Sequence, residues 1–249
     1  MQLYEMNWPQ VDQLPRDTPI VFPIAALEQH GHHMPLFTDS LLLGEVVRRV
    51  SERVADSVVI APLMWLGNSE HHLDFPGTMS AAPRTYLDLL KEMAGNFLHH
   101  GFDRIVFLNG HGGNILPGQQ ALFEIRQRDR DWQNQLLLST TYWDMAKPPA
   151  DEFEQSQMGH ACEWETSMML ALRPDLVGDY KHAETMPFGN PFPPAHRAWI
   201  TKERTATGHI GSPSAASAEK GERLFSLFSA GTAVFLQKVA DWDGVSWDG

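Results

Sequence analysis

Residues 20–39 of the chain read IVFPIAALEQHGHHMPLFTD. The apolar run from Ile20 to Ala26 has the length and continuity of a buried strand. A carboxylate, three imidazoles, a glycine and a second carboxylate follow it before a helical pattern begins at Ser40. Turns are usually built from Gly, Pro, Asn, Asp and Ser, for backbone reasons that histidine does not serve. We therefore expect a strand that ends in a metal site rather than in an ordinary polar loop.

The composition of the chain indicates one globular α/β domain that spans residues 1–249. With 249 residues, of which 43% are hydrophobic, the chain can fill a core without a second domain. Its 31 acidic residues exceed its 19 basic residues, so a phosphate backbone or an anionic membrane surface would repel it. We expect no nucleic-acid partner and no membrane partner.

The cellular location is inferred from the start of the chain and from its cysteine content. The opening residues, MQLYEMNW, lack the basic and apolar regions of a signal peptide. No run of the sequence approaches the roughly 18 apolar residues of a membrane span. A single cysteine, Cys162, cannot form an internal disulfide and is typical of a reducing compartment. We therefore expect a cytoplasmic protein whose metal ligands are nitrogen and oxygen atoms.

Strands and helices are predicted to alternate along the chain. The predicted strands are residues 19–25, 57–63, 104–109 and 136–142. The predicted helices are residues 40–55, 83–100, 115–128, 159–172 and 218–239, after a short helix within residues 1–16. This alternation favours a three-layer α/β/α sandwich with a mostly parallel sheet, in which ligands bind beyond the carboxyl ends of the strands. Residues 174–217 lack a regular pattern, and a loop of that length is usually functional.

Polar side chains follow the predicted strands, at the edge of the sheet where ligands are expected. Glu28 and His30 are two residues apart, so an extended backbone points both to the same side. Gly31 allows the chain to double back and bring Asp39, an expected cap of the next helix, toward them. Imidazole and carboxylate ligands together suit zinc, manganese or iron, and a carboxylate such as Asp39 can bridge two ions. His111, in the glycine-rich segment after the third strand, would complete the shell of one ion.

His160, Glu163 and Glu165 form a further polar cluster near the start of a predicted helix. Glu163 shares a helical face with His160, whereas Glu165 would diverge unless the helix begins at about Glu163, so the spacing leaves their roles open. Two divalent ions would activate a bridging water and polarise a carbonyl, while a nearby His or Glu moves a proton to the leaving nitrogen. This combination favours hydrolysis of an amide-type bond.

Each of these residues also has a structural interpretation. His111 could cap a helix, and the carboxylates of Glu163 and Glu165 could stabilise a helix amino terminus through its dipole. Trp143, at a strand end, could pack in the core. Two histidine pairs could either line a pocket or face solvent: His32 with His33, and His71 with His72.

Several segments of the chain resemble, in order, the motifs of the creatininase family, which includes creatinine amidohydrolases, deformylases and peptide-processing enzymes. They are ALEQHGHH at 26–33, FPGT at 75–78, NGHGGN at 109–114, YWD at 142–144 and HACEWETS at 160–167. The resemblance implies a flavodoxin-like α/β/α sandwich with a binuclear metal centre, usually assembled as a hexamer.

The resemblance also implies roles for individual residues. The implied metal ligands are Glu28, Asp39 and His111 for one ion, and His30 with the bridging Asp39 for the other. His160 and Glu165 match the catalytic residues of the family. The residues expected to contact the substrate are Trp143, which matches a substrate-stacking tryptophan, His71 and Asn109.

The chain departs from creatininase proper in ways that bear on metal and substrate. Creatininase has a glutamate ligand of the second metal at the position of Gly113, and we expect Glu163 to replace it. A second substrate-stacking tryptophan of creatininase corresponds to Ser156. The segment TGHIGSP at 207–213 resembles the broader members of the family more than creatininase. We therefore expect a family member other than creatininase proper.

The function that we expect is metal-dependent hydrolysis of a cyclic amide or formamide C–N bond in a small molecule. Two divalent ions, zinc or manganese with iron also possible, would act through a bridging hydroxide. An alternative, which the loss at Gly113 keeps open, is a catalytically weak member that binds a precursor peptide or ligand as a maturation factor. A third interpretation is an isomerase or lyase that uses a single metal to stabilise an enolate.

Overall fold

A parallel sheet in the order β2-β1-β3-β4 forms the centre of the molecule, in a computed structural model that describes residues 1–54, 56–128, 134–189 and 192–247. Its strands are β1 (Ile20–Ile24), β2 (Val59–Ile60), β3 (Arg104–Asn109) and β4 (Leu136–Thr141). Ile20 pairs with both Val59 and Ile105, and Ile24 pairs with Asn109. This is the strand order of flavodoxin-like sheets, whose ligand crevice opens between β1 and β3. The predicted parallel sheet is confirmed.

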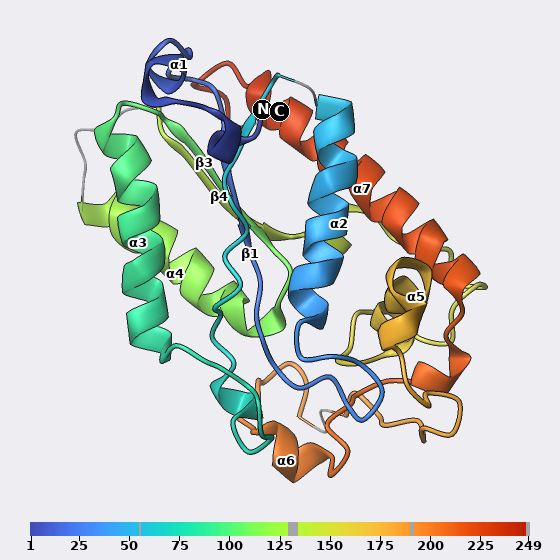
Figure 1. The fold of residues 1–249 in the computed structure, drawn as a ribbon. Helices are drawn as coiled ribbons and strands as arrows, with labels where there is room; N and C mark the ends of the chain where they lie inside the picture. The colour runs from blue at the N-terminus through green and yellow to red at the C-terminus, as the bar shows by residue number, and fades with distance from the viewer. Residues whose placement is uncertain (55, 129–133, 190–191, 248–249) are drawn as a thin grey trace.

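Helices cover both faces of the sheet, as predicted (Figure 1). The helices are α1 (Trp8–Asp12), α2 (Thr38–Val54), α3 (Pro83–His99), α4 (Ile115–Arg128), α5 (Glu163–Leu172), α6 (Thr201–Arg204) and α7 (Ala218–Ala240). Short 3₁₀ turns are η1 (Leu3–Glu5), η2 (Glu70–His72), η3 (Gly112–Asn114), η4 (Tyr142–Met145), η5 (Pro174–Leu176) and η6 (Pro213–Ala215). Among the described residues, no helix is both long and apolar enough to cross a lipid bilayer.

Alternating strand side chains join the two helical layers to the sheet. Val21 and Val106 pack in the core shared with α2, α5 and α7. Ile20 and Ile105 point the other way, into the core shared with α3 and α4. Successive side chains of a strand face opposite sides of the sheet, so each strand contributes to both cores. The result is the three-layer sandwich that the sequence predicts.

The second strand is shorter than predicted, Val59–Ile60 instead of residues 57–63. Val59 N and Ala61 N donate to β1 at Pro19 and Val21, but the next donor to β1 is Met64 N instead of residue 63, so one extra residue interrupts the ladder. The chain pairs with β1 again at Met64, whose N–H donates to the Pro23 carbonyl at 2.9 Å and whose carbonyl accepts from Ala25 N at 2.8 Å. This second pairing places the loop after β2 beside the loop after β1.

Three other predicted elements differ in their bounds or content, and one of them is the helix predicted over residues 159–172, which begins at Glu163. Helix α2 begins at Thr38, so Asp39 lies in its first turn and is not its cap. Residue 55 of that predicted helix and residues 248–249 of the tail lie outside the described residues. The predicted loop 174–217, of which residues 190–191 lie outside the described residues, contains η5, α6 and η6 in its described part, and Figure 1 shows α6 at the carboxyl end of the sheet.

Helix α5 is held against α7 by a close backbone approach at Gly221. A Cβ atom on Gly221 would lie 1.9 Å from the carbonyl oxygen of Ser167, so only glycine allows this spacing. In contrast, Gly95 of α3 has no atom within 4 Å of the position of a Cβ. Alanine substitution at Gly221 therefore tests the packing effect of a methyl group, and alanine substitution at Gly95 tests its effect on helix propensity alone.

We expect Gly221→Ala to lower the free energy of unfolding by about 1–3 kcal/mol, because α7 must move away from α5. Gly95→Ala, the matched control, should raise it by about 0.5–1 kcal/mol, because alanine favours a helix interior over glycine. Urea unfolding followed by circular dichroism measures both. Equal effects of the two substitutions would contradict the role given to Gly221.

Candidate metal centre

The loop after β1 folds back on itself and brings its carboxylates and imidazoles together. The Glu28 N–H donates to the Leu36 carbonyl at 2.9 Å, which closes the loop. Gly31 has a φ of 64°, a left-handed conformation that glycine adopts without strain. The first turn of α2 then carries Asp39 to the pair Glu28 and His30. All three of these predicted ligands are buried.

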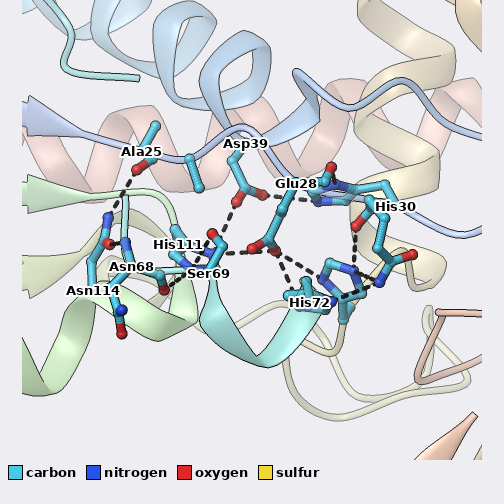
Figure 2. Close-up of polar contacts among 12 residues, drawn as sticks. Ala25, Glu28, His30, Asp39, Asn68, Ser69, His72, His111 and Asn114 are labelled. Carbon is cyan, nitrogen blue, oxygen red and sulfur yellow. Dashed lines mark hydrogen bonds and ion pairs between the residues drawn. The ribbon is translucent and has the colours of Figure 1, made fainter. Parts of the chain in front are cut away.

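Asp39 lies between two imidazoles that come from different strands (Figure 2). Its Oδ1 is 2.9 Å from His30 Nε2, and its Oδ2 is 3.0 Å from His111 Nδ1. Glu28 Oε1 is 3.3 Å from the same His111 nitrogen. A carboxylate whose two oxygens face two separate nitrogen ligands has the arrangement of a bridging ligand in a two-metal site.

Backbone carbonyls accept the outer ring N–H of both imidazoles. His30 Nδ1 donates to the Glu28 carbonyl at 3.0 Å, and His111 Nε2 donates to the Asn68 carbonyl at 2.9 Å. Asn68 is itself fixed by Asn114, whose Oδ1 accepts from Asn68 N and whose Nδ2 donates to the Ala25 carbonyl (Figure 2). We assign the proton of each neutral ring to these outer nitrogens. The inner nitrogens then direct lone pairs at carboxylate oxygens.

The resulting cluster fits a divalent cation. Both carboxylate oxygens of Glu28 and Oδ2 of Asp39 are buried without a hydrogen-bond partner among the described residues. A buried carboxylate in that state is strongly destabilising unless a positive charge compensates it. Nitrogen and oxygen donors in this combination suit zinc, manganese or iron.

Protons can supply the compensating charge when no ion is bound. Burial acts to lower the pKa values of His30 and His111, but the neighbouring carboxylates Asp39 and Glu28 outweigh it and raise both well above 6.5. Burial raises the pKa of Glu28, with His111 opposing it. Burial also acts to raise the pKa of Asp39, and His30 and His111 nevertheless hold it below its usual value. Metal binding therefore competes with protons for these positions.

The start of α5 adds His160 and Glu165 to the cluster. The helix begins at Glu163, which is the condition under which Glu165 can turn toward His160. Glu165 Oε1 is 3.8 Å from His30 Nε2, and His160 Nδ1 is 3.4 Å from Glu28 Oε1. The ligand atoms of His30, His160 and Glu165 all lie within 4.8 Å of one another. The two predicted catalytic residues thus lie beside the predicted metal ligands.

Glu163 is not brought to this cluster. Its Oε1 accepts a hydrogen bond from Lys220 Nζ at 2.5 Å, and its Oε2 accepts one from Gln155 N at 3.1 Å. Both partners lie on the side of α5 that faces α7 and residue 155. The expectation that Glu163 replaces the missing ligand therefore finds no support in its contacts, and Glu165 is the carboxylate of α5 that reaches the site.

Gly113 has a local reason to lack a side chain. A Cβ atom there would lie 2.1 Å from the Asn68 carbonyl oxygen and 2.5 Å from His111 Nε2. These are the two atoms that hydrogen-bond to orient His111. A glutamate at this position would displace the Asn68 carbonyl, so the loop after β3 in this chain has no room for the ligand of creatininase proper.

The three residues expected to contact substrate lie in different environments. Asn109 is buried and holds the loop, since its Oδ1 accepts from His111 N at 2.9 Å and its Nδ2 donates to the His111 carbonyl at 2.7 Å. Trp143 packs against the core and meets Tyr142 edge to face at 5.1 Å. His71 is half-buried, and its ring stacks 5.8 Å from that of His111. Of the three, His71 lies in ring contact with the cluster.

Gln29 fixes the ring orientation of a fourth histidine, His72, and the sequence analysis missed it. Gln29 Oε1 accepts from Gly31 N at 2.9 Å, so the amide nitrogen is the group that faces His72. That nitrogen donates to the Gly208 carbonyl at 2.8 Å and to His72 Nδ1 at 2.7 Å. His72 therefore carries its proton on Nε2, which lies 3.4 Å from Glu28 Oε1. The Nε2–H of this tautomer faces Glu28 without forming a hydrogen bond, and Glu28, His72 and His160 offer ligand atoms within 4.8 Å of one another.

Successive side chains of an extended segment point to opposite sides, which explains why the sequence did not indicate a role for Gln29. It lies between Glu28 and His30 and points to the opposite side of the extended segment. Its partners come from distant loops, and its own carbonyl accepts from His160 Nε2 at 2.7 Å. Only the folded chain reveals these contacts.

The remaining histidines of the first loop lie outside the cluster. His33 is buried, and its Nε2 lies within hydrogen-bond distance, 2.9 Å, of Thr166 Oγ1. Burial lowers the pKa of His33 to about 4. With His32, His182 and His209 it lines a separate cavity of about 410 Å³. These residues are therefore not ligands of the cluster.

Comparison with known proteins gives a consistent result over most of the chain. The Creatininase family model, described as creatinine amidohydrolase, matches residues 4–236. Creatinine amidohydrolase of Pseudomonas putida is 33% identical over 250 residues, which cover 92% of this chain and 93% of that protein. A mycofactocin precursor peptide peptidase of Mycolicibacterium smegmatis is 33% identical over 222 residues, which cover 86% of this chain and 82% of that protein.

Solved structures of creatininase share the fold. A structure of creatininase with Mn has a TM-score of 0.77 at 31% identity and covers 95% of this chain and 97% of that chain. A creatininase variant of Zn-Zn type has the same TM-score, identity and coverage. The expected metals, zinc and manganese, are therefore the metals of similar proteins.

We expect Glu165→Gln to reduce the affinity for zinc by about 10- to 100-fold or more, because it removes a carboxylate from the cluster. Glu163→Gln is the matched control on the same helix turn. It should retain the metal content and lower the free energy of unfolding by about 1–3 kcal/mol, because Lys220 loses its partner. Elemental analysis and urea unfolding measure the two effects. If Glu163→Gln lost the zinc and Glu165→Gln kept it, Glu163 would be the metal ligand.

We expect Gln29→Met, which keeps the side-chain volume and removes the amide, to keep the bound metal and to lower kcat by about 10-fold or more. Without the amide donor, the proton of His72 is free to move to Nδ1. Nitrogen-15 chemical shifts of the imidazoles report that tautomer directly. Unchanged His72 shifts in the variant would show that Gln29 does not fix the ring.

Proposed function

Because the chain belongs to the creatininase family of amidohydrolases, we propose that it hydrolyses an amide C–N bond with two divalent metal ions. The observation that carries the proposal is Asp39, whose two buried oxygens face the inner nitrogens of His30 and His111 separately. The proposed ligands are Glu28, Asp39 and His111 for one ion, and His30, Asp39 and Glu165 for the other. When bound, such ions polarise a carbonyl and lower the pKa of water.

We propose His160 as the residue that moves the proton. Its Nε2 donates to the Gln29 carbonyl, so Nδ1 presents a lone pair toward the cluster. Burial lowers the pKa of His160 well below 6.5, which keeps the ring neutral. Its side chain is 13% exposed, against 7% for Glu165, so a substrate has more access to it. His160 would take a proton from water and deliver it to the leaving nitrogen as the C–N bond breaks.

A hydrolytic role accounts for the site better than the two alternatives. The maturation-factor interpretation rested on the loss of a ligand at Gly113, and Glu165 provides a carboxylate in its place. The single-metal interpretation leaves one side of Asp39 without a function. Hydrolysis uses both oxygens of Asp39 and the lone pair of His160.

The substrate is proposed as an amide, either a small cyclic or formyl amide or a peptide. One relative acts on creatinine by its name, and another on a precursor peptide. The family resemblance further supports a proposed hexameric assembly.

Removal of the metal should abolish hydrolysis, and addition of zinc or manganese should restore it with a break at about two equivalents per chain. His111→Ala should lower kcat/KM by at least about 100-fold, because a metal ligand is lost. His99→Ala, on the exposed end of α3, is the control and should leave activity unchanged. The measurement is turnover of creatinine, formamides and short peptides by chelated and reconstituted protein. Activity that survives complete removal of metal would refute the proposed mechanism.

A further inference from the structure

A short segment from Trp199 to Arg204 lies over the side of the cluster that carries His71 and His72. The ring of Trp199 meets the ring of His71 edge to face, with centroids 5.3 Å apart. Thr201 Oγ1 lies 2.9 Å from His72 Nδ1. Figure 1 shows α6 at the carboxyl end of the sheet, next to the loop after β2. The segment is therefore in direct contact with the histidines that border the proposed site.

Trp199 and Arg204 form one continuous surface. The guanidinium carbon of Arg204 lies 4.7 Å from the centroid of the Trp199 ring. Arg204 Nη2 donates to the carbonyl oxygen of Phe188, which fixes the position of the group. The other guanidinium nitrogens have no hydrogen-bond acceptor among the described residues. Trp199 is 38% exposed and Arg204 is half-buried, so each side chain keeps part of its surface open to a ligand.

Within the part of the chain that the structure describes, the cations Lys202 and Arg204 of this segment, and Arg197 just before it, lack carboxylate partners, as does Lys238 of α7. The chain has 31 acidic and 19 basic residues, and many of its cations pair with acids, as Arg49 does with Glu222. No carboxylate of the described residues lies within 4.0 Å of the charged nitrogens of Arg197, Lys202 or Arg204. Unpaired cations at the protein surface raise the local concentration of anionic ligands.

Trp199 also provides an aromatic wall where the sequence lacks one. Ser156, at the position of a second substrate-stacking tryptophan in creatininase, is exposed and too small to form such a wall. Trp199 comes from a different segment, and its ring contact with His71 places it one ring away from His111. A planar or apolar group of a substrate could therefore pack on this ring next to the cluster.

We propose that Trp199 and Arg204 recognise an amide substrate that carries a carboxylate close to the bond that is cleaved, as a peptide or an N-acyl amino acid does. The inference rests on the proposed hydrolytic function and names its substrate class. Arg204 pairs with the carboxylate through its free guanidinium nitrogens, and Trp199 packs against the adjoining apolar group. A neutral cyclic amide lacks the carboxylate and gains nothing from Arg204.

Matched pairs of ligands test the proposal. One pair is an apolar tetrapeptide with a free carboxyl terminus and the same peptide with a carboxyl-terminal amide. The other is N-acetyl-leucine and N-acetyl-leucine amide, which separates a peptide from a small acyl amino acid. Calorimetric binding to the zinc-loaded full chain and rates of hydrolysis are both measured. The variants are Arg204→Gln and Trp199→Leu, with Lys238→Gln as a control at an exposed and unpaired cation of α7.

The wild-type chain should bind the free carboxylates about 10- to 100-fold more tightly than the amides. Arg204→Gln should make the affinities for the carboxylate and the amide of each pair nearly equal, without lowering the affinity for the amide. Trp199→Leu should lower the affinity for both members of each pair. Lys238→Gln should change neither. If carboxylate-dependent binding occurs without hydrolysis, the recognition surface stands and the proposed function fails. Three results would overturn the recognition surface. They are hydrolysis without a preference for the free carboxylate, a preference that survives Arg204→Gln, and no binding of any ligand.

Discussion

Two buried carboxylates that face imidazole nitrogens are the constraint on which the arrangement of the site depends. Glu28 and Asp39 lie 3.3 and 3.0 Å from the same nitrogen of His111. Both oxygens of Glu28 and Oδ2 of Asp39 have no hydrogen-bond partner among the described residues, and Oδ1 of Asp39 faces the inner nitrogen of His30 at 2.9 Å. Backbone carbonyls hold the outer N–H of His30 and His111, so the inner nitrogens of the neutral rings have no proton to give. Without a cation or added protons between them, desolvation and lone-pair repulsion would both oppose folding. The cluster therefore requires a positive charge, whatever reaction takes place there.

The topology of the sheet explains how one cluster collects residues so distant in sequence. Strands β1 and β3 are neighbours, so the loops that follow them leave the sheet side by side and carry Glu28 and His111 to the same point. Asp39 arrives from the first turn of α2, where a carboxylate is also favoured by the helix dipole. The segment 174–217 then closes over these loops through Gly208 and Thr201. Each ligand thus has a position that packing of the sandwich determines.

The sequence predicted those parts of the site that follow directly from a strand. Glu28, His30 and His111 come just after buried strands, and polar side chains at such positions in a parallel sheet are expected to converge. Spacing leaves the roles of Glu163 and Glu165 open, and the expectation that Glu163 replaces the ligand lost at Gly113 finds no support in its contacts with Lys220 and Gln155. The sequence did not predict the role of Gln29, because its partners lie in loops that have no periodic pattern. The predicted strand 57–63 is longer than β2 because one extra residue between Ala61 and Met64 interrupts the pairing with β1 within an apolar run.

The contrast between Gly113 and Glu165 links metal binding to the packing of the helices. In the loop after β3, the space for a side chain at residue 113 is occupied by the Asn68 carbonyl that orients His111. On the proposed assignment, the carboxylate comes from α5 instead, and its position depends on how α5 lies against α7. That position is set by the close approach at Gly221 and by the pair of Glu163 with Lys220. Glu163, directed away from the metal centre, would therefore stabilise the packing of the helix that carries Glu165 without being needed for metal binding.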